Sequence, residues 1–173
     1  TQSRLDDEKR LKEILSMTKS RLQMRFQSAG HSTAALRAMS YLSPISKFKD
    51  MTAGIAYYEV IQAIEEHFEE RKEELIANLQ KLTKMLFRGD NMMLSFTAAR
   101  EGLAGLAEMI CELKDGLFAE TVEDTACILH CEKRNEGFAT SSKVQYVARA
   151  GNFIDEGKKY TGALQILKVI LGY

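Results

Sequence analysis

The feature that most constrains the fold is an apolar stretch near the carboxy-terminal end of the sequence. In YTGALQILKVILGY, large aliphatic side chains recur at helical spacing and Lys168 is the only charged residue. A helix with so little polar surface is not stable in water unless other structure covers it. Because the sequence stops there without a cap or a polar tail, we expect the chain to be cut from a longer domain. The aliphatic residues are Leu164, Ile166, Leu167, Ile170 and Leu171.

Two other stretches alternate apolar and polar residues, which is typical of a half-buried strand. They are residues 92–98 (MMLSFTA), where we expect Phe96 to be buried, and residues 143–149 (KVQYVAR). Apolar residues at helical spacing predict most of the remaining structure. We therefore predict an α+β fold, in which a mainly helical chain carries few strands. The predicted helices span residues 6–28, 33–41, 55–87, 100–113 and 161–173, with breaks at Gly30 and Gly54 and a helix start at Pro44.

Composition narrows the class of protein. Lys and Arg together number 24, as do Asp and Glu, so the net charge of zero gives no electrostatic case for binding nucleic acid or an acidic membrane. No apolar run approaches the roughly 20 residues that span a bilayer, and the charged amino-terminal end does not resemble a signal peptide. Three cysteines, an odd number, favour reduced thiols. We expect a cytoplasmic location.

Several blocks of sequence, in order, carry a family resemblance. They are residues 30–61 (GHSTAALRAMSYLSPISKFKDMTAGIAYYEVI), 91–113 (NMMLSFTAAREGLAGLAEMICEL), 135–153 (NEGFATSSKVQYVARAGNF) and 162–173 (GALQILKVILGY). Together they resemble presequence-protease-like enzymes, a branch of the pitrilysin/insulinase family of zinc metallopeptidases. None of the blocks is a catalytic motif, so the resemblance is to a scaffold region.

The resemblance implies a domain assignment. The family consists of four related domains, each with a sheet backed by helices. On this basis residues 1–118 are the closing part of the third domain, residues 119–134 are a linker, and residues 135–173 are the truncated start of the fourth domain.

The resemblance also implies a role. The chain would be a non-catalytic segment from the carboxy-terminal half of a zinc metalloendopeptidase that degrades unstructured peptides. It would form part of the wall of the substrate chamber, with the amino-terminal half of the same polypeptide as its partner. The family's substrate-binding Arg and Tyr fall in a motif after Tyr173, so we assign no catalytic, cofactor-binding or metal residues here. Zinc would be bound outside this chain, and the chain alone would be inactive.

Two patterns are candidates for metal sites. The family's zinc motif is H-x-x-E-H, whereas His67-Phe68-Glu69-Glu70-Arg71 has Arg71 in place of the second histidine, and a guanidinium cannot bind a metal. We interpret this stretch as a charged helix surface. On a helix, Cys127, His130 and Cys131 would share one face, but Cys111 is the only further thiol. We interpret these cysteines as ordinary thiols, and His31 as a capping or turn residue.

A different class of function remains open. The long charged helix predicted over residues 55–87 also suits a stand-alone module that docks a partner helix and has no enzymatic parent. A reading frame that continues beyond Tyr173 would decide for the peptidase. We expect the apolar residues 164–171 to be covered, either by the helices of residues 1–118 or by a second chain in a homodimer, and we favour the homodimer.

Overall fold

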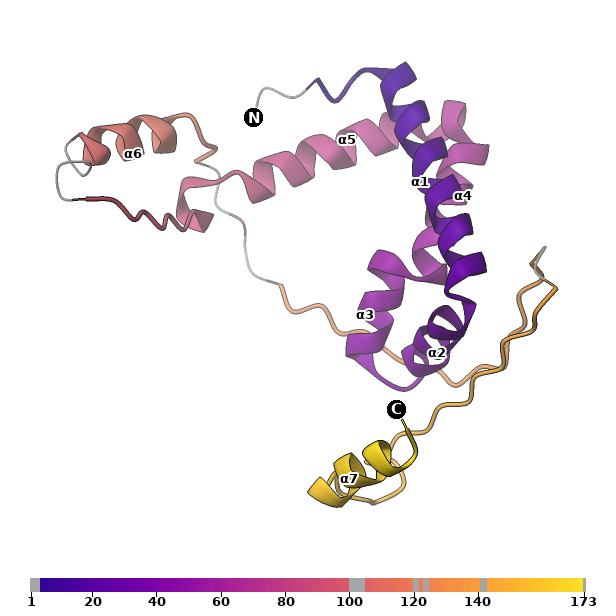
Figure 1. Cartoon of the computed structure of the whole chain (residues 1–173). Coiled ribbons are helices and arrows are strands. Elements are labelled where there is room, and N and C mark those ends of the chain that lie inside the picture. The colour runs from indigo at the N-terminus through magenta and orange to yellow at the C-terminus, as the bar shows by residue number, and fades with distance from the viewer. Residues whose placement is uncertain (1–3, 100–104, 120–121, 123–124, 141–142, 173) are drawn as a thin grey trace. The chain divides into compact units, whose positions relative to one another are not determined.

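The computed structural model describes residues 4–99, 105–119, 122, 125–140 and 143–172 (Figure 1). In order along these residues, the helices are α1 (Glu8–Ser28), α2 (Gly30–Ser40), α3 (Pro44–Ala53), α4 (Ile55–Glu66), α5 (Phe68–Leu86), the 3-10 turn η1 (Gly89–Asn91), α6 (Leu106–Asp115) and α7 (Gly162–Ile170). The helices predicted from periodicity are found, with three corrections. The predicted helix 55–87 is interrupted at His67, the residue before α5, Gly30 begins a helix and does not end one, and α6 starts at Leu106. Residues 100–104 of the predicted helix 100–113 lie outside the described residues.

The predicted α+β class is wrong, because the described residues form helices and no sheet. Residues 92–98 and 143–149 both lie outside any strand. Phe96, expected in a core, is 51% exposed, and Met93 is 96% exposed. Alternation identifies the face that a strand would bury, but a strand also needs a neighbour to accept its backbone hydrogen bonds.

The folded chain divides into two compact units, and the first contains Thr1–Met17 and Ala63–Ala126. In it the start of α1 contacts the start of α5, because Lys72 Nζ lies 2.9 Å from Glu8 Oε2 and Lys12 Nζ lies 5.6 Å from the centre of the Phe68 ring. Leu15 and Phe68 are its buried apolar side chains among the described residues. Beyond α5, the Phe118 N–H donates to the Phe87 carbonyl at 2.9 Å, next to an isolated parallel bridge between Arg88 and Phe118.

The second unit contains Thr18–Gln62 and Cys127–Tyr173. Its helical part is made of the second half of α1 with α2, α3 and the start of α4. Pro44 is in the first turn of α3, as predicted, and Gly54 ends that helix. The ring of Phe26 meets that of Tyr58 edge to face at 5.4 Å, and Arg25 Nη1 donates to the Ala53 carbonyl at 3.1 Å. Leu22, Ile55 and Ile61 are buried here.

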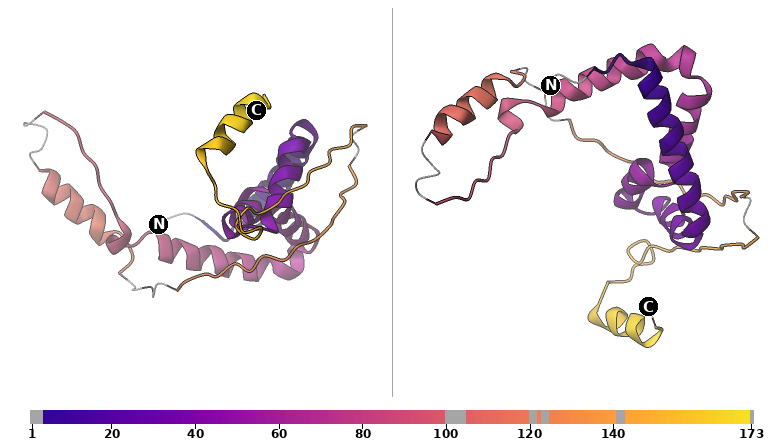
Figure 2. Two further views of the ribbon diagram at one scale, coloured as in Figure 1. Left: turned by 90° about the horizontal axis from the view of Figure 1, so that it is seen from below. Right: turned by 45° about the horizontal axis from the view of Figure 1, so that its top comes forward.

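The rest of the second unit has little regular structure before α7. Residues 127–140 and 143–161 contain neither helix nor strand in the described chain, and their trace runs from orange to yellow in Figure 2. The large aliphatic side chains of α7 are mostly exposed: Ile166 by 64%, Leu167 by 47%, Val169 by 75% and Ile170 by 73%. The cover expected for this helix is therefore not supplied by the described residues of the chain itself. None of the described helices combines the length and the apolar character that crossing a membrane requires.

Candidate functional site

The best-connected polar residues of the second unit gather where α2, α3 and α4 meet. Asp50, near the end of α3, is only 2% exposed. Its Oδ1 accepts a hydrogen bond from the Ile55 N–H at 2.9 Å, which satisfies a free donor at the start of α4. Its Oδ2 lies 2.7 Å from Arg37 Nη1 on α2. One buried carboxylate therefore ties three helices together.

Gly54 allows this arrangement. A Cβ at Gly54 would lie 2.1 Å from Asp50 Oδ1 and 2.8 Å from the Asp50 Cα. Both distances are below any real carbon contact, and the second involves backbone that cannot turn away. The sequence element Asp50-x-x-x-Gly54-Ile55 thus acts as one capping motif. Its carboxylate caps the next helix, and its glycine leaves the space that the carboxylate needs.

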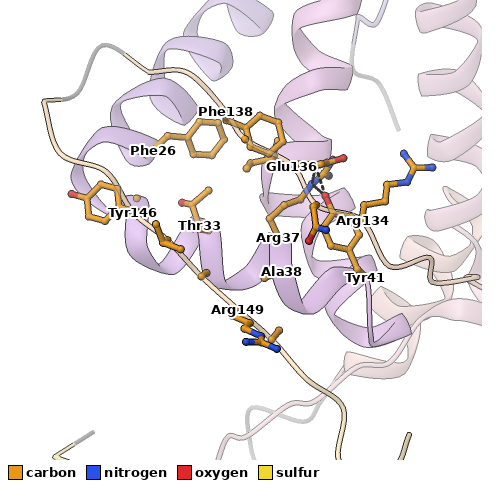
Figure 3. A pocket seen from close by; sticks show the side chains of 18 of the residues that line it. Phe26, Thr33, Arg37, Ala38, Tyr41, Arg134, Glu136, Phe138, Tyr146 and Arg149 are labelled. Atoms are coloured by element: carbon orange, nitrogen blue, oxygen red, sulfur yellow. Dashed lines mark hydrogen bonds and ion pairs between the residues drawn. The ribbon is translucent and has the colours of Figure 1, made fainter.

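Arg37 links this capping motif to the segment around Glu136, almost one hundred residues later in the sequence (Figure 3). Its Nε lies 3.0 Å from Glu136 Oε2 and 2.8 Å from the Tyr41 hydroxyl, which itself donates to Glu136. The guanidinium carbon lies 5.4 Å from the centre of the Tyr41 ring and 5.5 Å from that of Phe138, within the range of cation–π attraction. The Arg37 side chain is only 15% exposed, so these interactions are partly shielded from water.

The cluster shifts the pKa of three groups. The hydrogen bond from Tyr41, and then that from Arg37, lowers the pKa of Glu136 because both favour the ionised carboxylate. Burial raises the pKa of the Tyr41 hydroxyl, and its bond to Glu136 adds to this effect. Burial alone would lower the pKa of Arg37, but the bonds to Glu136 and Asp50 outweigh it and the net shift is upward. The charged state of the Arg37–Glu136 pair is thus stable at neutral pH.

A cavity of about 1390 Å³ lies beside the cluster, entirely within the second unit. It is lined by the end of α1, by α2, by the start of α4 and by residues within 133–140 and 144–156 (Figure 3). At one end of the cavity the Tyr146 ring packs on Gly30, where an added Cβ would come within 2.4 Å of the ring. The centres of the His31 and Tyr146 rings are 6.2 Å apart. His31 is exposed in the first turn of α2, and the hydrogen bonds between described residues give it no capping role.

The candidate zinc motif is a charged surface. His67 precedes α5, and its Nδ1 lies 3.7 Å from Glu70 Oε2, with both side chains exposed. Arg71 Nε lies 3.4 Å from Glu74 Oε2. These contacts are ordinary pairs of a solvated helix, and Arg71 stands where a zinc site would need a second imidazole.

The candidate cysteine cluster does not take the helical form that would bring its members together. Cys127, His130 and Cys131 lie in the non-helical part of residues 125–140, so they share no helix face. Cys111 and Cys127 are exposed and Cys131 is half-buried. Among the residues described, no three His, Cys, Asp or Glu side chains are grouped to hold a metal ion, so the donors of this part of the chain do not fit zinc.

The residues that form the cluster were missed in the sequence. Two local signals were available, namely the i, i+4 spacing of Arg37 and Tyr41 and the position of Asp50 shortly before a new helix. Glu136 and Phe138 gave no signal, because their partners are on α2 and nothing in a polar stretch specifies a distant contact.

Comparison with known proteins gives relatives along nearly the whole chain. Residues 1–64 match a family described as associated with peptidases of family M16, subfamily C. The chain is 30% identical to Protein HypA of Clostridium perfringens over 169 residues, which is 98% of this chain and 17% of the relative. It is 23% identical to presequence protease 1, chloroplastic/mitochondrial, of Arabidopsis thaliana over 163 residues, which is 93% of this chain and 15% of the relative. No solved structure matches significantly.

The chain thus spans about a sixth of the length of these curated relatives. The family match covers α1, α2, α3 and most of α4, which include Arg37 and Asp50 of the cluster. The longer matches to the two relatives also include the segment that carries Glu136. These matches support a fragment of a pitrilysin-family (M16) metallopeptidase, from its carboxy-terminal region.

Proposed function

We propose that this chain is a non-catalytic segment in the carboxy-terminal half of a zinc metalloendopeptidase that degrades unstructured peptides, and that it forms part of the wall of the substrate chamber. The observation that carries the proposal is the alignment with presequence protease over 93% of this chain. The assignment of residues 1–118, 119–134 and 135–173 to successive family domains stays a prediction within it.

The cavity of the second unit supports a wall function. Its lining combines aromatic side chains, including Phe26, Tyr58 and Phe138, with charged groups of both signs. Such a surface suits contact with peptides of varied sequence, because aromatic faces and dispersed charges make no demand on one particular side chain. Arg37 and Asp50 would keep this surface in shape while chemistry takes place elsewhere in the protein.

Zinc enters the proposal only as a metal held by residues outside this chain, where it would activate water. The amino-terminal half of the same polypeptide is the proposed partner. A cytoplasmic location is part of the same proposal. For the isolated chain we propose a homodimer, since the exposed aliphatic residues of α7 form an apolar surface that a second copy could cover.

The test compares the complete protein that contains this sequence with the 173-residue chain. A quenched fluorescent peptide without secondary structure is the substrate. We expect cleavage by the complete protein that a chelator abolishes, and no cleavage by the chain. In the complete protein, Arg37→Ala should reduce kcat/KM with an unchanged zinc content, whereas exposed Glu74→Ala should change neither. Chelator-sensitive cleavage by the chain alone would contradict the proposal, as would a gene whose product is only this chain.

A further inference from the structure

Residues 133–140 form one wall of the cavity, and every one of them lines it. This segment, called the strap from here on, lies wholly within the described residues and contains no helix or strand. Side chains fix it to the helices. Glu136 bonds to Arg37 of α2 and to Tyr41, the residue just after that helix, and the Phe138 ring lies against the Arg37 guanidinium.

The contacts of Arg37 fall into two separable groups. The bond to Asp50 at 2.7 Å is between helices, and the Asp50 side chain is only 3% exposed. The bond to Glu136 at 3.0 Å is to the strap, and the Glu136 side chain is 25% exposed. Loss of Glu136 would leave Arg37 paired with Asp50, so the three helices can remain intact while the strap moves.

A further carboxylate, that of Glu59, would remain near Arg37 when the strap moves away. Glu59 Oε2 on α4 lies 3.9 Å from Arg37 Nη2, and its side chain is 52% exposed. When Glu136 leaves, the guanidinium therefore keeps two acidic neighbours and is not left as an isolated, partly buried charge. This lowers the free energy of the state in which the strap is released. The other charged groups beside Glu136, Glu132 and Arg134, pair with each other at 3.0 Å and are exposed.

We propose that the strap is a movable wall of the cavity, and that Arg37, Tyr41 and Glu136 form a latch that holds it closed. Release breaks the bonds to Glu136 and removes Phe138 from Arg37, which opens the cavity along the whole length of the strap. The helices and the Asp50 contact stay in place. The latch adds a movable part to the wall described under the proposed function, and it does not depend on the proposed peptidase activity.

The sequence contains no tryptophan, so Phe138→Trp places a single fluorescent reporter on the strap. In this background we compare Glu136→Gln, which breaks the latch, with Glu132→Gln, which removes an equal charge from the neighbouring exposed pair. A hydrogen bond to a charged group is worth enough to change the open population by about tenfold or more. We expect Glu136→Gln to raise acrylamide quenching toward that of the urea-unfolded chain, with helical circular dichroism unchanged. Glu132→Gln should leave the quenching as it was.

A readout without tryptophan uses the native thiols. Cys131 is half-buried two residues before the strap, and exposed Cys111 serves as the internal reference. In the full chain with Phe138 restored, Glu136→Gln should raise the alkylation rate of Cys131 relative to Cys111 several-fold, by mass spectrometry. Equal quenching and equal alkylation in the Glu136→Gln and Glu132→Gln variants would overturn the latch. Loss of helical signal in Glu136→Gln would also overturn it, because the contact would then be part of the folding core and not separable.

Discussion

Helices α2, α3 and α4 and the segment 125–161 belong largely to the same unit, yet they are stabilised in different ways. The three helices form internal backbone hydrogen bonds and meet at a buried carboxylate that caps α4. The segment has no regular structure in its described residues, and Val147 and Ile154 are more than 80% exposed. A helix can form from its own residues, whereas extended backbone needs a neighbour. The difference shows that local sequence is enough to specify the helices, whereas the position of the segment depends on side-chain contacts with other parts of the unit.

Asp50→Ala should destabilise the helical part of the second unit, and of the substitutions considered it should lower the unfolding free energy most. It removes the cap of α4 and leaves the Arg37 guanidinium without its closest partner. Breaking such a pair costs about 3–5 kcal/mol of unfolding free energy when it is buried. We expect a large drop in the midpoint of urea unfolding, followed by circular dichroism. Glu74→Ala, which breaks the exposed pair with Arg71, is the control and should change the free energy by less than about 1 kcal/mol. Equal effects would mean that Asp50 is not a structural centre.

The sequence predicted most of the helices correctly, but it did not predict the structure of the non-helical segments. Spacing of apolar residues and the signals at Pro44 and Gly54 located the helices of the second unit, because these signals act within a few residues of each other. Alternation at residues 92–98 and 143–149 suggested strands, but it could not supply the neighbouring strand that a sheet requires. The partnership of Arg37 with Glu136 depends on how distant segments are brought together, and no local pattern contains that information.

Gly54→Ala tests whether the close approach of Gly54 to Asp50 matters as much as the carboxylate itself. The added Cβ would collide with the Asp50 backbone, and overpacking of this kind costs about 1–3 kcal/mol. We expect a lower melting temperature. Gly162→Ala, at a position with open space within 4 Å, is the matched control and should be neutral or slightly stabilising. A Gly54→Ala protein that melts like the control would show that the end of α3 shifts at no cost.

The pH dependence of the Glu136 contact tests the anchored segment. The pKa of Glu136 is lowered from its ordinary value of 4.5, so the ionised form favours the folded state. Its contribution to stability is complete above about pH 4.5 and is lost as the pH falls through the lowered pKa of the folded state. We expect the stability difference between the natural chain and Glu136→Gln to be constant from about pH 7 to about pH 5 and to shrink below 4.5. A difference that already disappears near about pH 6 would assign the contact to another titrating group.

Leu167→Glu should have the smallest effect on the stability of a single chain. The side chain is 47% exposed, so its replacement removes little packing and should change the unfolding free energy by about 0.5 kcal/mol or less. If α7 covers itself in a second copy, the same change should abolish the dimer in analytical ultracentrifugation. Lys168→Glu, a charge reversal on the neighbouring residue, is the control for charge alone. A natural chain that sediments as a monomer at every concentration would contradict self-association.

The backbone contact of Phe118 with Phe87 has a consequence for variation among related proteins. It brings together the two ends of the stretch from Arg88 to Leu117, so that the chain leaves and re-enters the end of α5 at a fixed point. The length of a loop whose ends are already joined affects stability weakly, since each doubling costs only about 0.6 kcal/mol in closure entropy. Changes in length should therefore be tolerated between these two phenylalanines outside η1 and α6, for example in the non-helical residues 92–99, where a foreign peptide tag could be inserted without disturbing α5.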